Sequence, residues 1–544
     1  MTASIVLFNG RIHTVDSDDT IVEAIAIKGN KILAVGGNEE IKKYGNRDTM
    51  SVDLHGKTVL PGIFDSHNHT GAAGVLLKGV MLFGAKNIKE LQNRVAQRVA
   101  ESQVGSWIRG GGWIESQFTE YRLPTRWDLD EVAPDNPVIL SRLFGAVVVN
   151  SSALKLAGIT KHTVDPWRGS IGRAKNGEPN GILYDGAREL VTRVMPAEAA
   201  SNTVEEAKKD ILRALTEYQK YGITSIIDPG VSGMRRLAYQ LLFNENNLPI
   251  RINMMPVYNG LYASMGQDLT PMVEHMGIIN GFGNEWLNLG ALKMAIDGGL
   301  GSKTSWMNES FLDGTFSEIP LRLDINKLGH YFATAQKYRW SIGIHCCGDK
   351  AQDVAVDTFV KTIINNPNSD ARHNIIHGYF PTPKSLDNMQ KYNIGVSVQP
   401  GFMYVEGDIY FDVIEQERVN RFKPLKTYLD AGILVAANSD MTSAHYNPFL
   451  GMYAAVARKT SQGRSLGTEE KINRREMLRL FTINGAKLAF MADKTGSLEQ
   501  GKLADLVVIN EDILTVAEDE IKDLKVLLNI TDGRIVYDSL HPTE

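Results

Sequence analysis

The stretch that decides the fold is Val59-Leu60-Pro61-Gly62-Ile63-Phe64-Asp65-Ser66-His67-Asn68-His69. It is an apolar run, broken by Pro-Gly, that leads into two histidines two positions apart. On a β-strand, positions i and i+2 face the same way, so both imidazoles would point in one direction. At the carboxyl end of a barrel strand they would face the active-site mouth, where two nitrogen ligands can hold one metal ion. The alternative is a pair of surface histidines in a loop.

Short apolar runs recur along the middle of the chain, and amphipathic stretches lie between them. Repeated strand–helix units are typical of a parallel sheet. Their number fits a (β/α)₈ TIM-like barrel, which we expect at residues 61–491. The apolar runs are Ile223–Asp228, Leu289–Ala295, Ser341–His345, Asn374–His377, Gly395–Gln399 and Leu434–Ala437, and the amphipathic stretches include Val204–Tyr221, Lys350–Asn365 and Pro383–Tyr392.

Both ends of the chain consist of short segments of β type. Asn9-Gly10 and Gly29-Asn30 separate apolar runs near the start, and Asp532-Gly533 does so near the end. Such dipeptides between apolar runs indicate β-hairpins. We therefore expect residues 1–60 and 492–544 to form one small β-sandwich domain from both chain termini, with the α/β barrel inserted between them.

One segment of the barrel region, at about residues 80–200, is too long for a single strand–helix unit. We expect it to be an insertion or a lid. Within it, Arg109–Trp113 and Pro124–Pro137 are rich in glycine or proline, and we expect irregular loops there.

The composition of the 544-residue chain is that of an ordinary globular protein. Its 63 acidic and 58 basic residues give a net charge of −5 and are spread along the sequence. A nucleic-acid partner or a polybasic membrane contact would need clustered basic residues, so we expect neither. Cys346 and Cys347 are the only cysteines, and neighbours do not form a disulfide framework. Without a signal peptide or a long apolar stretch, we expect a cytoplasmic protein.

Three further candidate ligands close apolar runs in the same way. His345, His377 and Asp440 each end such a run, and polar or small residues follow. Singly, each is more often an ordinary polar residue at a strand end. The chain has only 12 histidines, however, and four of them lie at the ends of candidate strands. In a barrel these ends converge on one face, which favours a shared site.

Lys293 lies inside the apolar run Leu289–Ala295. A buried ammonium group is costly, so this lysine must pair with a carboxylate, lose its proton or be modified. An ion pair with Asp297 or another carboxylate is the simpler alternative. The other is carbamylation, in which CO₂ adds to the neutral amine and gives a carboxylate that can bridge two metal ions.

Taken together, these segments resemble the metal-dependent amidohydrolase superfamily, and within it amidohydrolase family 3, the branch with N-substituted formamide deformylase-like enzymes. The resemblance implies a (β/α)₈ barrel with a β-sandwich made from both chain ends. It rests on Asn9–Ile12, Gly29–Ile32, Leu60–Gly62, His67–His69, Lys293 with Asp297-Gly298, His345 with Gly348-Asp349, His377-Gly378, Ser397–Pro400, Asn438–Asp440, Thr482–Ala486, Gly496–Glu499 and Gly501–Val507.

The resemblance also implies a binuclear metal centre. His67, His69 and Asp440 would hold the more buried ion, and His345 and His377 the more exposed one, with carbamylated Lys293 as the bridge. Such ligands suit several divalent metals, and we expect Zn²⁺. Asp440 would also be the catalytic residue that moves protons. For the assembly we expect a homodimer.

The predicted function is hydrolysis of a non-peptide C–N bond in a small molecule, such as an amide, N-formyl or cyclic amide group, by a hydroxide that bridges the two ions. An ester or lactone hydrolase and a mononuclear deaminase on the same barrel remain alternatives, although Lys293 argues against a single metal. A metal-free, non-enzymatic assembly protein is a remote alternative, because it would lack ligands that this chain has. Trp113, Trp306, Phe402 and Tyr404 flank the candidate segments and could line a substrate pocket, with core packing as the alternative.

Three positions depart from the family pattern. Ala146 stands where many relatives have a histidine, and Asp185 stands where we expect glutamate. Cys346-Cys347 follows His345 in place of small apolar residues. We expect these changes to affect the choice of substrate rather than the metal site.

Overall fold

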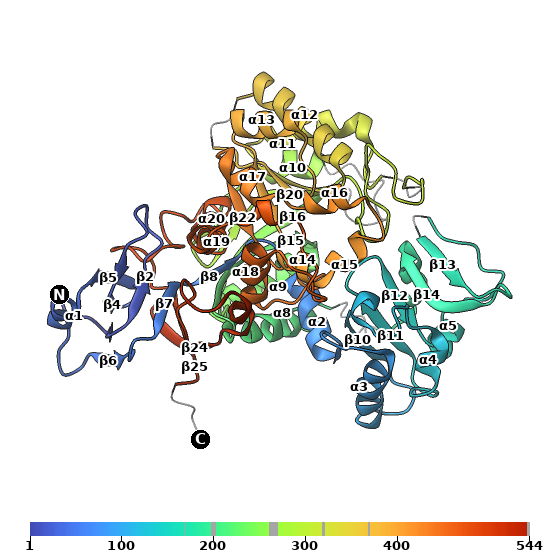
Figure 1. The fold of residues 1–544 in the computed structure, drawn as a ribbon, viewed down its shortest axis with the longest axis horizontal. Coiled ribbons are helices and arrows are strands. Elements are labelled where there is room, and N and C mark those ends of the chain that lie inside the picture. Colours follow the sequence, from blue (N-terminus) through green and yellow to red (C-terminus); the bar gives the residue numbers. More distant parts are fainter. Residues whose placement is uncertain (168, 197–202, 260–269, 318–320, 368–369, 541–544) are drawn as a thin grey trace.

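A barrel of eight parallel strands forms the centre of the computed structural model, which describes residues 1–167, 169–196, 203–259, 270–317, 321–367 and 370–540 (Figure 1). Ser66, directly after the first strand, donates its backbone N–H to the carbonyl oxygen of Ala437 at the end of the last strand, at 3.3 Å. The two edge strands therefore meet, which confirms the predicted (β/α)₈ barrel. In spatial order the strands are β8 (Ile63–Asp65), β15 (Ile223–Val231), β16 (Arg251–Asn259), β18 (Leu292–Ala295), β19 (Ile342–Cys346), β20 (Asn374–His377), β21 (Gly395–Val398) and β22 (Val435–Ala437).

The barrel strands follow the apolar runs of the sequence to within a few residues, with two exceptions. The runs named from the sequence did not include β16, whose residues Arg251–Asn259 mix polar and apolar side chains. The run Leu289–Ala295 is split between β17 (Leu287–Leu289), which pairs with β16, and β18. Gly290 lies at the break, where a Cβ atom would come within 2.0 Å of the side-chain oxygen of Asn253. The side chain of Asn253 thus occupies the space that a continuous strand with side chains would need.

Helices cover the outside of the barrel, and several of them have one apolar face, whereas α18 is buried on almost all sides. In α8, Thr203 accepts a hydrogen bond from the N–H of Glu206, and Ile211, Leu215 and Tyr218 are buried at helical spacing. The helices that follow the chain around the barrel are α8 (Val204–Gln219), α9 (Gly233–Asn244), α10 (Thr270–Met276), α11 (Leu328–Lys337), α12 (Asp349–Asn365), α13 (Pro383–Lys391), α17 (Leu425–Asp430), α18 (Pro448–Ala457), α19 (Arg474–Leu480) and α20 (Ile483–Leu488). Of the helices in the described ranges, none is both long and apolar enough to cross a bilayer.

Two further sheets are built from the chain ends and lie beside the barrel (Figure 1). One joins β5, β4, β1 and β6, and the other joins β25, β24, β23, β7, β2 and β3. The antiparallel pair β7 and β23 links the start of the chain to its end. The bounds are β1 (Ile5–Phe8), β2 (Arg11–His13), β3 (Ile21–Val22), β4 (Ala24–Lys28), β5 (Lys31–Gly36), β6 (Met50–Asp53), β7 (Thr58–Pro61), β23 (Leu506–Ile509), β24 (Val526–Thr531) and β25 (Arg534–Asp538).

A buried ion pair joins the barrel to these terminal sheets. Arg251 at the start of β16 contacts Asp505 at 2.7 Å and Asp532 at 2.8 Å. Removing one member of a buried pair leaves the other charge without compensation, which costs about 3–5 kcal/mol. We therefore expect Arg251→Ala to lower the free energy of unfolding by about that amount, measured as a shift of the urea midpoint. Lys426→Ala breaks an exposed pair with Asp430 and should cost less than about 1 kcal/mol; equal shifts would contradict the prediction.

The insertion between β8 and β15 has a sheet of its own, in the order β13, β14, β12, β11, β10 and β9. The loops expected at Arg109–Trp113 and Pro124–Pro137 are therefore wrong in part, because β10 runs through the first and α4 lies in the second. Gly110 and Gly111 let neighbouring strands come close, since a Cβ atom on either would lie under 3.0 Å from a backbone oxygen. The bounds are β9 (Val80–Met81), β10 (Ile108–Trp113), β11 (Val138–Arg142), β12 (Ala146–Val149), β13 (Gly169–Arg173), β14 (Pro179–Asp185), α2 (Thr70–Lys78), α3 (Ile88–Ala100), α4 (Arg126–Asp130) and α5 (Ser151–Leu156).

Candidate metal centre

Three of the predicted ligands lie together where β8 and β22 end. The Nε2 atoms of His69 and His67 lie 3.3 and 3.8 Å from Oδ1 of Asp440. One ligand atom from each of the three side chains lies within 4.8 Å of the others. Burial lowers the pKa of His67 well below its ordinary value, so its imidazole is neutral and keeps a lone pair for a metal ion.

An unsatisfied carboxylate oxygen fits a cation held by this first group. Within the described ranges, Nδ1 of His67 and Oδ1 of Asp440 are buried without a hydrogen-bond partner. Buried polar atoms are nearly always paired, so such a gap inside a set of ligands needs an explanation. An ion held by these side chains would satisfy the carboxylate oxygen.

The backbone holds the two segments of this group together. The N–H of Asp440 donates to the carbonyl of His67, and the N–H of His69 donates to the carbonyl of Met441, both at 2.9 Å. Asp65 adds a cross-link, because its carboxylate accepts hydrogen bonds from Ser439, through both the backbone N–H and the hydroxyl. Asp65 thus supports the site from β8, a role that the sequence did not predict.

Two candidate ligands have backbone conformations that favour glycine. The φ angle is +47° at Asp440 and +82° at His377. Such conformations cost about 1–3 kcal/mol and persist where the surroundings enforce them, often at functional sites. Here they direct the carboxylate of Asp440, after β22, and the imidazole of His377, at the end of β20, into the two ligand groups.

Lys293 lies on β18 with only 1% of its surface exposed. Its Nζ atom lies 3.3 Å from Nε2 of His67, and it makes no ion pair within the described ranges. Asp297, the alternative partner, instead accepts hydrogen bonds from the backbone N–H groups of Trp306, Cys347 and Gly348. Burial lowers the pKa of Lys293 to about 7, so a large share of the amine is neutral near physiological pH.

A second group lies at the ends of β19 and β20. Nδ1 of His345 lies 2.7 Å from Nε2 of His377, and the thiol of Cys347 lies 3.5 Å from Nε2 of His345. One ligand atom from each lies within 4.8 Å of the others. The rings of His377 and His67 are 6.2 Å apart, so the two groups are neighbours. Burial lowers the pKa of both His345 and His377 well below the ordinary value, which leaves them neutral.

Gln399 sets the orientation of His377. Its Oε1 atom lies 2.8 Å from Nδ1 of His377 and also accepts a hydrogen bond from Nζ of Lys423 at 2.7 Å. An oxygen at this position requires a proton on Nδ1, so Nε2 keeps the lone pair that a metal ion needs. The sequence contained Gln399 only within the motif Ser397–Pro400, and no pattern pointed to Lys423.

Gln399→Leu is expected to weaken the affinity of the second group for Zn²⁺ by about 10–100-fold, the usual effect of losing a partner that orients a histidine ligand. Competition with a chromophoric chelator measures this affinity. Gln399→Glu keeps an acceptor for His377 and should restore most of it. Unchanged affinity in Gln399→Leu would show that the tautomer of His377 has another origin.

The four aromatic residues predicted at the pocket lie in different surroundings. Trp113 is buried in the core of the insertion and stacks on Phe118, which matches the alternative of core packing. Phe402 is also buried, but its ring lies 6.4 Å from that of His377. Trp306 is half-buried and donates its backbone N–H to Asp297, and Tyr404 is half-buried against Tyr453. Phe402 thus adjoins His377 of the second group, whereas Trp306 contacts Asp297, which also accepts a hydrogen bond from the backbone of Cys347.

The insertion contacts the barrel close to the second group. A Cβ atom on Gly301, in the segment after β18, would lie 2.9 Å from the ring of Phe144, and one on Gly145 would lie 3.2 Å from Ser302. The neighbouring Ala146 pairs with Tyr184 at the start of β12. The position at which the chain departs from the family pattern is therefore next to the contact between insertion and barrel.

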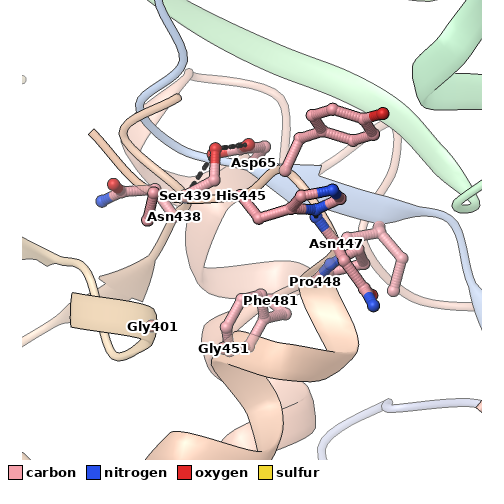
Figure 2. A pocket seen from close by; sticks show the side chains of 12 residues that line it. Asp65, Gly401, Asn438, Ser439, His445, Asn447, Pro448, Gly451 and Phe481 are labelled. Atoms are coloured by element: carbon pink, nitrogen blue, oxygen red, sulfur yellow. Dashed lines mark hydrogen bonds between the residues drawn. The ribbon is translucent and has the colours of Figure 1, made fainter. Parts of the chain in front are cut away.

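A small cavity is lined by Asp65, Ser439 and His445, among others (Figure 2). Figure 2 shows Ser439 bonded to Asp65 at one edge and the imidazole of His445 at another. Burial lowers the pKa of His445 to about 4, so its ring is neutral there. Of the residues in the two ligand groups, none lines this cavity. It is therefore separate from the candidate metal centre.

Comparison with known proteins decides the family. The model of the "Amidohydrolase family" matches residues 51–537. The chain belongs to this family. Among curated relatives, Protein LONG AFTER FAR-RED 3 of Arabidopsis thaliana is 32% identical over 521 residues, which cover 94% of this chain and 88% of that protein. N-substituted formamide deformylase of Arthrobacter pascens is 27% identical over 540 residues, which cover 98% of each.

Solved structures agree with this assignment. An uncharacterised metal-dependent hydrolase from Pyrococcus horikoshii OT3 is similar with a TM-score of 0.73 at 26% identity, over 95% of this chain and 99% of that one. The resemblance inferred from the sequence motifs is thus confirmed. Since amidohydrolases are metal-dependent enzymes, this member is a metal-dependent hydrolase that acts on C–N bonds.

Proposed function

We propose that this amidohydrolase cleaves an amide, N-formyl or cyclic amide bond of a small molecule with the help of two divalent metal ions, both Zn²⁺. His67, His69 and Asp440 would hold one ion, and His345 and His377 the other. The observation that carries the proposal is the convergence of the two ligand groups at the carboxyl end of the barrel, beside Lys293. The relative named for its action on N-substituted formamides supports the class of bond.

We propose further that Lys293 is carbamylated and bridges the two ions. Its buried amine forms no ion pair within the described residues and lies next to His67. Carbamylation forms a bond between Nζ and the carbon of CO₂ and releases one proton to solvent. The product is a carboxylate, which a binuclear centre accommodates and a buried ammonium group does not provide.

The ions would supply Lewis-acid chemistry, by activating water and polarising the substrate carbonyl. Asp440 would accept the proton of the attacking water and pass it to the leaving nitrogen. Its Oδ1 atom is buried, has no hydrogen-bond partner within the described ranges and lies 3.3 Å from Nε2 of His69, so it faces the site. His67, His345 and His377 are neutral and would bind rather than exchange protons.

Metal content and a substrate panel test this proposal together. Protein purified without added metal or chelator should hold close to two zinc ions per chain and hydrolyse an N-formyl, acyl-amide or cyclic amide substrate in preference to an ester. One ion per chain with release of ammonia from an amino heterocycle would favour the mononuclear deaminase. No metal after incubation with Zn²⁺ and bicarbonate would refute the proposal.

A further inference from the structure

Cys347 follows His345 with the same spacing that separates His67 from His69. Because side chains alternate along an extended strand, the thiol of Cys347 and the imidazole of His345 leave the end of β19 on the same side. Both cysteines are buried in the same apolar core. Of the two, Cys347 is the one whose thiol lies beside His345 and in the second ligand group.

The position of the Cys347 thiol fits a ligand. Ligand atoms held 2.0–2.3 Å from one tetrahedral zinc ion lie roughly 3.3–3.8 Å apart. The sulfur of Cys347 lies 3.5 Å from Nε2 of His345, which also lies 3.1 Å from the carbonyl oxygen of Gly298, whereas His377 lies against Nδ1 of the same ring. One ligand atom from each of Cys347, His345 and His377 lies within 4.8 Å of the other two. The three are buried or half-buried at the ends of neighbouring strands.

The surroundings hold Cys347 in this place. Its backbone N–H donates to Oδ1 of Asp297 at 3.0 Å, and the other carboxylate oxygen accepts from the N–H of Gly348 at 2.7 Å. Gly348 packs directly against the backbone of Trp306. A Cβ atom on Gly348 would lie 1.9 Å from the carbonyl oxygen of Trp306. The thiol is 2% exposed and forms no disulfide. It is thus prepositioned, reduced and shielded from solvent.

The number of ligands points the same way. The first group contributes three side chains of its own, His67, His69 and Asp440, whereas the second contributes only His345 and His377 under the proposed function. A thiolate from Cys347 would give the second ion three as well. Zinc readily accepts two imidazoles and a thiolate, whereas thiolates are poor ligands for the harder Mn²⁺ and Mg²⁺.

We propose that Cys347 is a thiolate ligand of the ion in the second group and makes that position selective for zinc. The proposal rests on the binuclear site of the proposed function and adds a ligand to it. When the metal binds, a sulfur–metal bond forms and the thiol proton leaves to solvent. Metal binding with Cys347 as a ligand therefore releases one more proton than metal binding by the neutral histidines alone.

Cobalt substitution of the full-length holoenzyme tests the proposal, because a thiolate bound to Co²⁺ gives a charge-transfer absorption in the near ultraviolet that nitrogen and oxygen ligands do not. We expect this absorption in the wild type and in Cys346→Ser, the matched control, and its loss in Cys347→Ser. Zinc affinity of the second group should fall in Cys347→Ser by more than the roughly 10–100-fold that loss of an orienting partner causes. X-ray absorption of the zinc form should show sulfur at about 2.3 Å.

Suppose that the wild-type protein holds two zinc ions and that X-ray absorption shows no sulfur bound to them. That result would overturn the proposal and leave Cys347 as a hydrogen-bond partner of His345. Retention of the charge-transfer absorption in Cys347→Ser would overturn it as well. If Cys347→Ser does not fold, the wild-type absorption and X-ray measurements decide alone. A wild type that binds no metal would instead refute the proposed function, so the two failures are distinguishable.

Discussion

Replacement of Lys293 by methionine should leave the enzyme with one ion per chain and lower kcat by about 10²–10³-fold. Methionine fills most of the space of the buried lysine but cannot add CO₂, so the bridge is lost while packing is largely kept. Lewis-acid stabilisation by the lost ion is worth several kcal/mol, and each 1.36 kcal/mol is a factor of ten in rate. Elemental analysis and steady-state kinetics measure the two effects.

Lys293→Ala provides the matched control, because it leaves room where methionine does not. A short free carboxylic acid such as formate or propionate could enter that space and supply the missing bridge. We therefore expect such acids to restore activity and the second ion in Lys293→Ala but not in Lys293→Met. Two ions and full activity in Lys293→Met would show that the lysine does not bridge the site.

Asp440→Asn should lower kcat by about 10²–10⁴-fold in protein saturated with Zn²⁺, since this is the usual contribution of general acid–base transfer. Asparagine keeps the size and one ligand oxygen of Asp440, but it cannot accept a proton from the attacking water. Because the loss affects the chemical step, KM should change much less than kcat. Steady-state kinetics at saturating metal separate the two parameters.

Asp210→Asn controls for the loss of a buried acid in general. Asp210 lies on α8, is 1% exposed and pairs with Arg213, outside both ligand groups. We expect its kcat to equal that of the wild type even if its stability falls. Equal loss of activity in both variants would mean that Asp440 acts through folding and not through proton transfer.

The barrel and part of the site follow from simple periodicity. An apolar run before His67-Asn68-His69 placed two imidazoles on one side of a strand end, and the structure brings both to Asp440. The same rule of alternation applied to His345 and Cys347, where the spacing is identical. The thiol could therefore have been predicted as a neighbour of the second group.

Other features depend on contacts between distant segments. Glycines usually interrupt strands, but Gly110 and Gly111 lie within β10 because the neighbouring strands approach too closely for side chains. Gln399 and Lys423 lie in separate loop segments. Only the fold brings the side-chain oxygen of Gln399 to His377 and Nζ of Lys423 to that same oxygen. No local pattern encodes such three-part arrangements.

The pairing of β7 with β23 has a consequence for biosynthesis. β7 passes through Gly62 directly into β8, which leads to His67, yet its antiparallel partner is translated about 445 residues later. At ordinary rates of elongation that interval lasts roughly 20–90 s. During this time the nascent chain exposes the unpaired edge of β7 to chaperones and to neighbouring chains made on the same messenger RNA. The candidate metal-binding histidines are therefore made early, but the sheet that supports them is completed only once β23 has been made.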